Sequence, residues 1–297
     1  MYASTLFLTV VSGLAATVAA NYTEYVSNYT FTHWGPTLDA SKFDYELSMA
    51  KEAMNLFKAR LGPNGYNLTV PETKDDLPHA LAQLKTTKDN LGPDGLVSLF
   101  KQDIADADKY WHDAIANSDG TTWKPTDGHC ICYIPSLSAA SFGLWSTSPA
   151  ADAVNNDANP EHYIKQTTTG ANGLPKSNIL EGWGGVTTHF DIMNFTAPDH
   201  TKYPFLRQLP EYPIQAAGPK VLKDGTTFGV LHLAVKDVKD AKYGKGFEVF
   251  STIWYQSGVT EEHIEAEREH MINEIVNLSI YAAKDAKSGV KARHFAS

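Results

Sequence analysis

The order in which hydrophobic periodicities follow one another along the chain most limits what it can fold into. From about residue 38 to 118, apolar residues recur at steps of three and four, which is one face of a helix. From about 128 to 256, β-branched and aromatic runs alternate with Gly, Pro, Asn and Asp clusters, which is typical of strands and turns. A helical pattern returns from about 260 to 287. This order indicates an α+β fold, without the regular strand–helix alternation of a parallel sheet.

The helical part predicts three helices. The first carries an apolar stripe and ends at the Gly-Pro-Asn-Gly sequence of residues 62–65. A second is predicted over 75–90, and a third begins at Pro93 and closes before Gly120. The stripe of the first helix consists of Phe43, Leu47, Ala50, Met54, Phe57 and Leu61.

The second part predicts six strands, at 129–134, 140–146, 162–168, 186–195, 226–236 and 247–256. Polar loops are predicted at 149–160 and 170–178, and a hairpin turn at 223–226. We therefore expect one α+β domain over 21–297, with an N-terminal helical segment, an antiparallel β-sheet and a long C-terminal helix packed on the sheet. A curved sheet closed by that helix would enclose a cavity.

The first twenty residues have the composition of a signal peptide. Met1 to Ala20 contain no charged side chain, and small residues at Val18 and Ala20 place the cleavage after Ala20. No later segment approaches ~20 apolar residues, so we expect no membrane contact after cleavage. The sequence thus predicts a secreted, extracellular protein, with an uncleaved anchor as the alternative.

Secretion gives meaning to the Asn-X-Ser/Thr triplets, which accept N-linked glycans on exposed surfaces. Each such asparagine is predicted to be exposed and is a candidate glycosylation site. The five are Asn21, Asn28, Asn67, Asn194 and Asn277.

Charge and cysteine content restrict the partners and the covalent chemistry. The net charge of −9 gives no electrostatic reason to bind nucleic acid. Residues Cys130 and Cys132 are the two cysteines, and a bridge between them would be strained in a strand. Two free thiols and an intermolecular link are the alternatives. The sequence holds no nucleophile elbow, no His-Glu-X-X-His pattern and no phosphate-binding loop, so no cofactor is expected.

The predicted strands carry four candidate catalytic residues. His189 and Asp191 are two apart in one strand and share a face, so the carboxylate would orient the imidazole as a general base. His232 and Glu248 lie on two other strands and are the candidate acids. If these strands are neighbours, the four side chains line one cavity together with the ligand-binding candidates Trp254 and Tyr255.

The terminal helix carries a row of ionisable residues. His263, Glu267, His270 and Glu274 follow one another at steps of four, three and four, so they share one face. We interpret this row as a solvated edge with His–Glu pairs. The alternative is a metal site using His263, Glu267 and His270, which would need further ligands from elsewhere.

Three functions remain open at this stage. The first is an enzyme performing lyase- or isomerase-type acid–base chemistry on a small apolar or aromatic molecule, with His189 as base. The second is a non-catalytic protein that binds a ligand or a surface. The third is a metalloprotein using the terminal helix. A small molecule is the expected partner, whereas its identity is not encoded in any motif.

Overall fold

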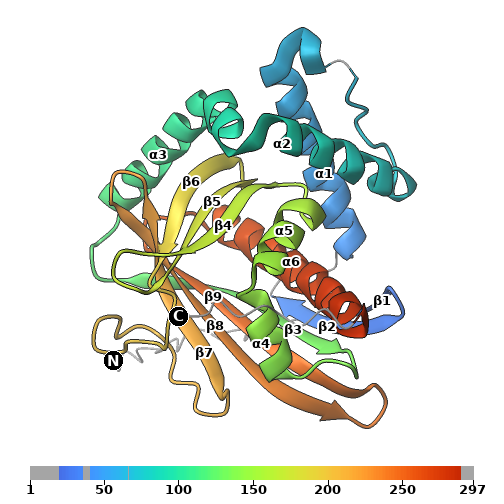
Figure 1. The fold of residues 1–297 in the computed structure, drawn as a ribbon. Coiled ribbons are helices and arrows are strands. Elements are labelled where there is room, and N and C mark those ends of the chain that lie inside the picture. Colours follow the sequence, from blue (N-terminus) through green and yellow to red (C-terminus); the bar gives the residue numbers. More distant parts are fainter. Residues whose placement is uncertain (1–19, 36–40, 66, 289–297) are drawn as a thin grey trace, which may run out of the picture.

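The computed structural model describes residues 20–35, 41–65 and 67–288, and within them nine strands form one antiparallel sheet (Figure 1). The strand order across the sheet is β1-β2-β3-β9-β8-β7-β6-β5-β4. The predicted α+β fold is confirmed, since helices precede the sheet and one long helix follows it. The strands are β1 (Ala20–Val26), β2 (Tyr29–Gly35), β3 (Trp123–Tyr133), β4 (His162–Thr169), β5 (Pro175–Trp183), β6 (Val186–Met193), β7 (Ile214–Leu222), β8 (Thr227–Asp240) and β9 (Gly244–Gln256).

The helices begin and end at identifiable signals. Ser41 caps the first of them, because its hydroxyl accepts from the Asp44 amide at 3.2 Å while the Asp44 carboxylate accepts from the Ser41 amide. Gly92, at φ 63°, bends the second helix where the sequence predicts a break, and a further break at Phe100 divides the predicted third helix. The helices are α1 (Lys42–Leu61), α2 (Leu77–Leu99), α3 (Lys101–Ala116), α4 (Ala139–Ser146), α5 (Pro149–Ala158) and α6 (Glu261–Ser288).

Two predicted elements are wrong in type. The strand predicted at 140–146 is helix α4, and the loop predicted at 149–160 is largely helix α5. In both cases a serine cap decides the outcome: Ser138 accepts from the Ser141 amide at 3.1 Å, and Ser148 from the Ala151 amide at 3.3 Å. The end of the loop predicted at 170–178 belongs to β5, and strands β1, β2, β5 and β7 were not predicted.

Strands β1 and β2 form a hairpin around a two-residue turn. Ser27 and Asn28 both have positive φ, at 53° and 67°, as a hairpin turn of this length requires. Cleavage after Ala20 would leave all but the first residue of β1 in place. Residues 1–19 lie outside the described residues, so the signal peptide stays a prediction.

Helix α6 packs closely against β3. A Cβ atom on Gly128 would lie 2.8 Å from the Cβ of Met271, so a larger residue there would push the helix away. The core under this contact joins α6 to β2, β3, β9 and α4. Its fully buried members include Phe31, Cys130, Cys132, Phe142, Phe247, Val249 and Val276.

The opposite face of the sheet is also covered. The segment at 197–213, between β6 and β7, lays Phe205 on Trp123 with ring centroids 4.3 Å apart. Arg207 forms a bidentate pair with Asp127 and lies 5.2 Å from the ring centre of Trp254. Both faces of β8 and β9 are therefore covered over much of their length, while the ends of the two strands near residues 237–245 are exposed.

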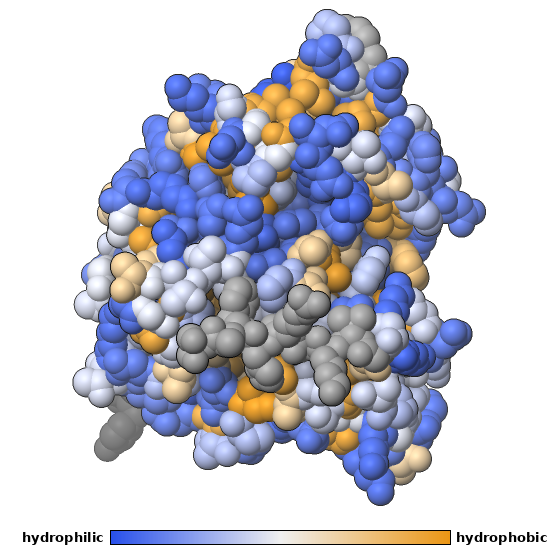
Figure 2. All heavy atoms as spheres, in the orientation of Figure 1, coloured by the Kyte–Doolittle hydropathy of each residue, from blue (hydrophilic) through white to orange (hydrophobic). Residues whose placement is uncertain are grey.

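The surface seen in Figure 2 is largely hydrophilic, and hydrophobic residues show between the helices at the top of the view, where α1–α3 lie. Among the described residues, none of the helices combines the length and the apolar composition needed to cross a membrane.

The two cysteines are free thiols in the structure. Cys130 and Cys132 point to the same face of β3, and their sulfur atoms lie 3.8 Å apart in the core. A disulfide bond is about 2.05 Å long, so the strand geometry keeps the two sulfur atoms well beyond bonding distance.

The prediction that Asn277 is exposed is wrong. Its side chain is only 4% exposed. The amide nitrogen donates to Asn159 Oδ1 at 2.8 Å, to Glu46 Oε1 at 2.9 Å and to the Ala158 carbonyl at 3.2 Å. A glycan there would have to displace α1 and α5. Asn28 and Asn67 are exposed, Asn194 is half-buried, and glycosylation of Asn21, Asn28, Asn67 and Asn194 stays a prediction.

We expect the Asn277→Ala variant to lower the free energy of unfolding by about 1–3 kcal/mol, because it leaves buried acceptors without a donor. Chemical denaturation with urea measures this. The Asn67→Ala variant is the matched control, since Asn67 is exposed, and should change the free energy by less than about 0.5 kcal/mol. Equal losses in the two variants would contradict this account.

Candidate functional site

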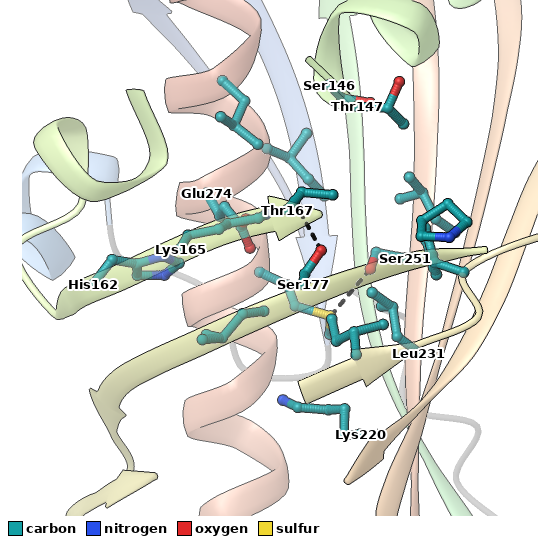
Figure 3. Close-up of a pocket in the computed structure, with 18 of the residues that line it drawn as sticks. Ser146, Thr147, His162, Lys165, Thr167, Ser177, Lys220, Leu231, Ser251 and Glu274 are labelled. Atoms are coloured by element: carbon teal, nitrogen blue, oxygen red, sulfur yellow. Dashed lines mark hydrogen bonds and ion pairs between the residues drawn. The ribbon is translucent and has the colours of Figure 1, made fainter. Parts of the chain in front are cut away.

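A cavity of about 400 Å³ lies between the sheet and α6. Strands β4–β9 form its wall on one side, and α4 and α6 close it on the other (Figure 3). Most of the lining surface is apolar. The apolar side chains are Phe142, Leu144, Ile179, Phe190, Ile192, Phe195, Leu231, Leu233, Val249, Ile253, Met271, Ile275 and Leu278.

Exposure falls from one end of the cavity to the other. The lining residues Leu144, Thr147, Thr169 and Pro175 are exposed, so they form the mouth. The other end is ionisable, and each of its lining residues is at most 5% exposed. We call this the charged end; it consists of His162, Glu181, Lys220, Glu267 and His270, with Glu161 directly behind His270.

Two imidazoles face one another at the charged end. His162, the first residue of β4, and His270, on α6, approach with their Nε2 atoms 3.3 Å apart. The Nδ1 atom of His270 lies 3.0 Å from Glu161 Oε1, which also accepts from the Tyr45 hydroxyl at 3.2 Å. The Nδ1 atom of His162 hydrogen-bonds the side-chain oxygen of Asn155. Each ring is therefore fixed by a buried acceptor.

Two carboxylates and one lysine complete the charged end. Lys220, from β7, lies 3.7 Å from Glu181 Oε1 and 3.7 Å from Glu267 Oε1. Trp183 donates to Glu181 Oε1 at 2.9 Å, and the Tyr255 hydroxyl donates to Glu267 Oε2 at 2.8 Å. Lys220 lies among four aromatic rings, the nearest being Phe190 at 4.7 Å from its amino group. Buried ions in this arrangement are compensated by one another.

Burial and neighbouring charges shift the pKa values here in different directions. Burial raises the pKa of Glu267, against the opposing charge of Lys220. Burial lowers the pKa of His162. Burial also disfavours charge on His270, but the hydrogen bond with Glu161 and the charge of Glu181 outweigh it and raise its pKa to about 9. Such divergent shifts within one cavity are typical of functional sites.

Three of these groups are also suited to hold a metal ion. Glu161, His162 and His270 each offer a ligand atom, and these atoms lie within 4.8 Å of one another. Imidazole nitrogen and carboxylate oxygen are the donors that zinc-type ions bind.

The predicted pair His189 and Asp191 lies away from the cavity. Side chains alternate along β6, and Phe190 and Ile192 point inward, so His189 and Asp191 point to the opposite face. Asp191 pairs with two lysines, at 2.7 and 3.0 Å, and does not orient His189. His189 Nε2 lies 2.9 Å from Asn178 Oδ1, and burial lowers the pKa of this histidine to about 4.

His232 and Glu248 also point to the opposite face. His232 hydrogen-bonds Gln215 at 3.0 Å, and burial lowers its pKa to about 4. Glu248 accepts from Tyr212 at 2.9 Å and pairs with Lys236 at 3.1 Å. The prediction that these two residues line one cavity with His189 and Asp191 is wrong. The segment at 197–213 covers the outer face of the sheet, so His232 and Glu248 are buried there as they would be in a core.

Of the predicted residues Trp254, Tyr255, His263, Glu267 and His270, some lie at the cavity and others do not. Trp254 lies under the 197–213 segment, whereas Tyr255 faces inward and reaches the charged end. The solvated edge predicted for α6 is wrong, since His263, Glu267 and His270 are at most 3% exposed. Glu267 and His270 line the cavity, while the ring of His263 packs against Trp183, with centroids 4.5 Å apart.

Sequence reasoning missed four residues of the charged end: Glu161, His162, Glu181 and Lys220. A usable signal existed in the strands. Glu181 follows Ile179 and Leu180, and Lys220 precedes Val221 and Leu222, so each is a charge beside apolar residues of a strand. The neighbours Glu161 and His162 stand at the start of β4 and carried no such signal.

No family model matches the sequence, and no curated protein does. Solved structures that resemble it include norcoclaurine synthase from Thalictrum flavum (12% identity, 60% of this chain and 94% of that chain, TM-score 0.35). Others are the major latex-like protein 151 from Panax ginseng (12%, 54% and 97%, 0.35) and the Zhui aromatase/cyclase from Streptomyces sp. R1128 (10%, 58% and 98%, 0.33). Similarity at this level carries no argument about function.

We expect Glu248 to act in stability rather than in chemistry. Although burial opposes its charge, hydrogen bonds from His129 and Lys236 lower its pKa from 4.5 to about 2. Because the folded pKa is the lower one, the stabilisation is complete above pH 4.5 and is lost as the pH falls through 2. The Glu248→Gln variant should therefore lose about 1 kcal/mol at neutral pH and converge with the wild type in acid.

Thermal unfolding across pH measures this difference. The exposed Glu72→Gln variant is the control and should follow the wild type throughout. A deficit of Glu248→Gln that stays constant with pH would show that the ionised carboxylate is not its cause.

Proposed function

We propose that the protein is an enzyme that binds a small molecule with an apolar or aromatic body and performs acid–base chemistry, of lyase or isomerase type, on its polar end. One observation carries this proposal: an apolar cavity ends in ionisable side chains that are almost fully buried. Burying charge is costly, and a stable core does not need it.

The cavity supports the binding half of the proposal. Its volume of about 400 Å³ is in the range of small-molecule sites, which are mostly apolar with a few convergent polar groups. Leu231 and Leu233 point from β8 into the cavity and are only half-buried, although His232 between them is buried. Apolar surface kept open inside a protein favours an apolar ligand as its partner.

Glu267 is the best placed proton carrier. Tyr255 holds its Oε2 atom, and its Oε1 atom lies toward Lys220 at the cavity. The raised pKa of Glu267, caused by burial, brings proton uptake and release closer to neutral pH. The ammonium group of Lys220 can stabilise negative charge that develops on an oxygen of the ligand. These two roles suffice for enolisation, dehydration or cyclisation.

Proton transfer to and from carbon can be measured on a model ketone, so the test does not require the natural substrate. We expect the wild-type protein to accelerate exchange of the α-protons of 1-indanone in D₂O, measured by NMR. The Glu267→Gln variant should lower that rate by about 10²–10⁴-fold, because it removes the general base. It should still bind the neutral fluorescent probe N-phenyl-1-naphthylamine.

Two further variants connect the probe with the cavity. Leu233→Trp should fill the cavity and weaken probe binding at least tenfold, whereas Lys239→Trp, on the exposed end of the same strand, should not. Full exchange by Glu267→Gln would remove this residue from the proposed role. Probe binding without any exchange would instead favour a non-catalytic ligand-binding protein.

We also propose that the chain is secreted and glycosylated. The support is the uncharged apolar stretch before Ala20 and the exposure of Asn28 and Asn67. Expression in a eukaryotic secretory host should release into the culture medium a protein that begins at Asn21 and that loses mass when its N-glycans are removed enzymatically. An intact amino terminus, or a mass that does not change, would contradict this proposal.

A further inference from the structure

Three ligand-type atoms converge on one point at the charged end. The Nε2 atoms of His162 and His270 lie 3.3 Å apart, and Glu181 Oε2 lies 3.8 Å from the first and 4.0 Å from the second. Ligand atoms around a tetrahedral zinc ion, each about 2.1 Å from the metal, are about 3.4 Å apart. The two distances to Glu181 Oε2 are therefore slightly longer than those between the ligand atoms of a bound zinc ion, whereas the distance between the two Nε2 atoms already matches.

The other polar atom of each of these groups is already held by a buried partner. Glu161 binds Nδ1 of His270 at 3.0 Å, and Trp183 binds Oε1 of Glu181 at 2.9 Å. Asn155 binds Nδ1 of His162. Metal-bound histidines and carboxylates are oriented by partners of this kind, which also fix the tautomer with hydrogen on Nδ1.

The orientation of Asn155 fixes the tautomer of His162. The amide nitrogen of Asn155 donates to the carboxylate of Glu274, so its oxygen must face the ring and accept from Nδ1–H. His270 meets the Glu161 carboxylate and is fixed in the same way. In each ring Nε2 is consequently the atom that faces the other ring, at 3.3 Å, and the position between the two atoms takes either a shared proton or a metal ion.

The local charge is also compatible with a bound cation. Four carboxylates surround this point or line the cavity beside it, together with the two ammonium groups of Lys165 and Lys220 and the imidazole of His270, whose pKa is raised to about 9. A divalent ion in place of the proton on His270 Nε2 would keep these buried carboxylates paired with positive charge. The four carboxylates belong to Glu161, Glu181, Glu267 and Glu274.

We propose that His162, His270 and Glu181 bind a divalent transition-metal ion of the zinc type. Two imidazoles and one carboxylate are a ligand set of catalytic zinc sites, which leave a fourth position for water or substrate. All three side chains line the cavity, so that position opens into it. Resting on the proposed function, the ion would polarise an oxygen of the ligand, and the substrate class narrows to apolar molecules that carry a carbonyl or hydroxyl group.

This site differs from the one predicted on α6. His270 is shared, but His263 packs on Trp183 and Glu267 is bound by Tyr255 and Lys220. The partners of His270 come from β4 and β5, which are far away in the sequence.

The experiment uses the full-length purified protein, stripped with EDTA and then titrated with ZnCl₂ or CoCl₂. We expect one metal ion per chain by mass spectrometry, and visible d–d absorption bands for the cobalt form. His162→Gln and His270→Gln should weaken binding by at least 100-fold. Glu161→Gln, which removes only the partner of His270, should weaken it by about 10–100-fold. His189→Gln, a histidine on the other face, is the matched control and should bind as the wild type does.

Failure of the stripped wild-type protein to bind zinc or cobalt stoichiometrically would overturn the inference, and a shared proton would then join the two rings. Unchanged binding by both histidine variants would also overturn it. Because the wild-type titration is decisive by itself, a variant that does not fold leaves the conclusion intact. The outcome is separable from the proposed function, since Leu233→Trp should lose the naphthylamine probe and keep the metal.

Discussion

The burial of the polar face of α6 is the constraint on which the rest of the structure depends. His263, Glu267, His270, Glu274 and Asn277 follow one another along this helix, and the sheet and the other helices leave them little contact with water. Each needs a partner that the helix itself does not supply. Those partners come from α1, α5, β4, β5, β7 and β9, so the position of six elements is tied to one row of side chains.

The same helix explains why a cavity exists. Gly128 allows α6 to approach β3 closely, whereas β6, β7 and β8 line the cavity that separates them from the helix. Apolar residues fill the space between α6 and β3, and the space between α6 and β6–β8 is the cavity. The charged end lies where the polar row meets the wall of this opening, which is why ionisable groups and apolar lining occur in one place.

The sequence predicted the elements better than it predicted the directions of their side chains. The long terminal helix, five of the strands and the turn at 223–226 occur close to where they were predicted. Helices α4 and α5 did not, because serine caps outweigh composition in such short segments. Alternation along a strand gives two faces but does not say which one is inside. The outer face of β8 and β9 is covered by a loop, so the sequence pattern predicted His232 and Glu248 to be cavity residues, whereas both have structural roles.

The gradient of exposure along the cavity has a consequence for the order of events in binding. A substrate of the proposed kind that passes the mouth at Leu144 and Pro175 would enter with its polar head first, since only the deep end can solvate that head in place of water. Its tail arrives last and stays nearest the solvent. Under the proposed function, the site would select the head group and tolerate variation in the tail, and a tail longer than the cavity would project outward between α4 and the β4–β5 hairpin.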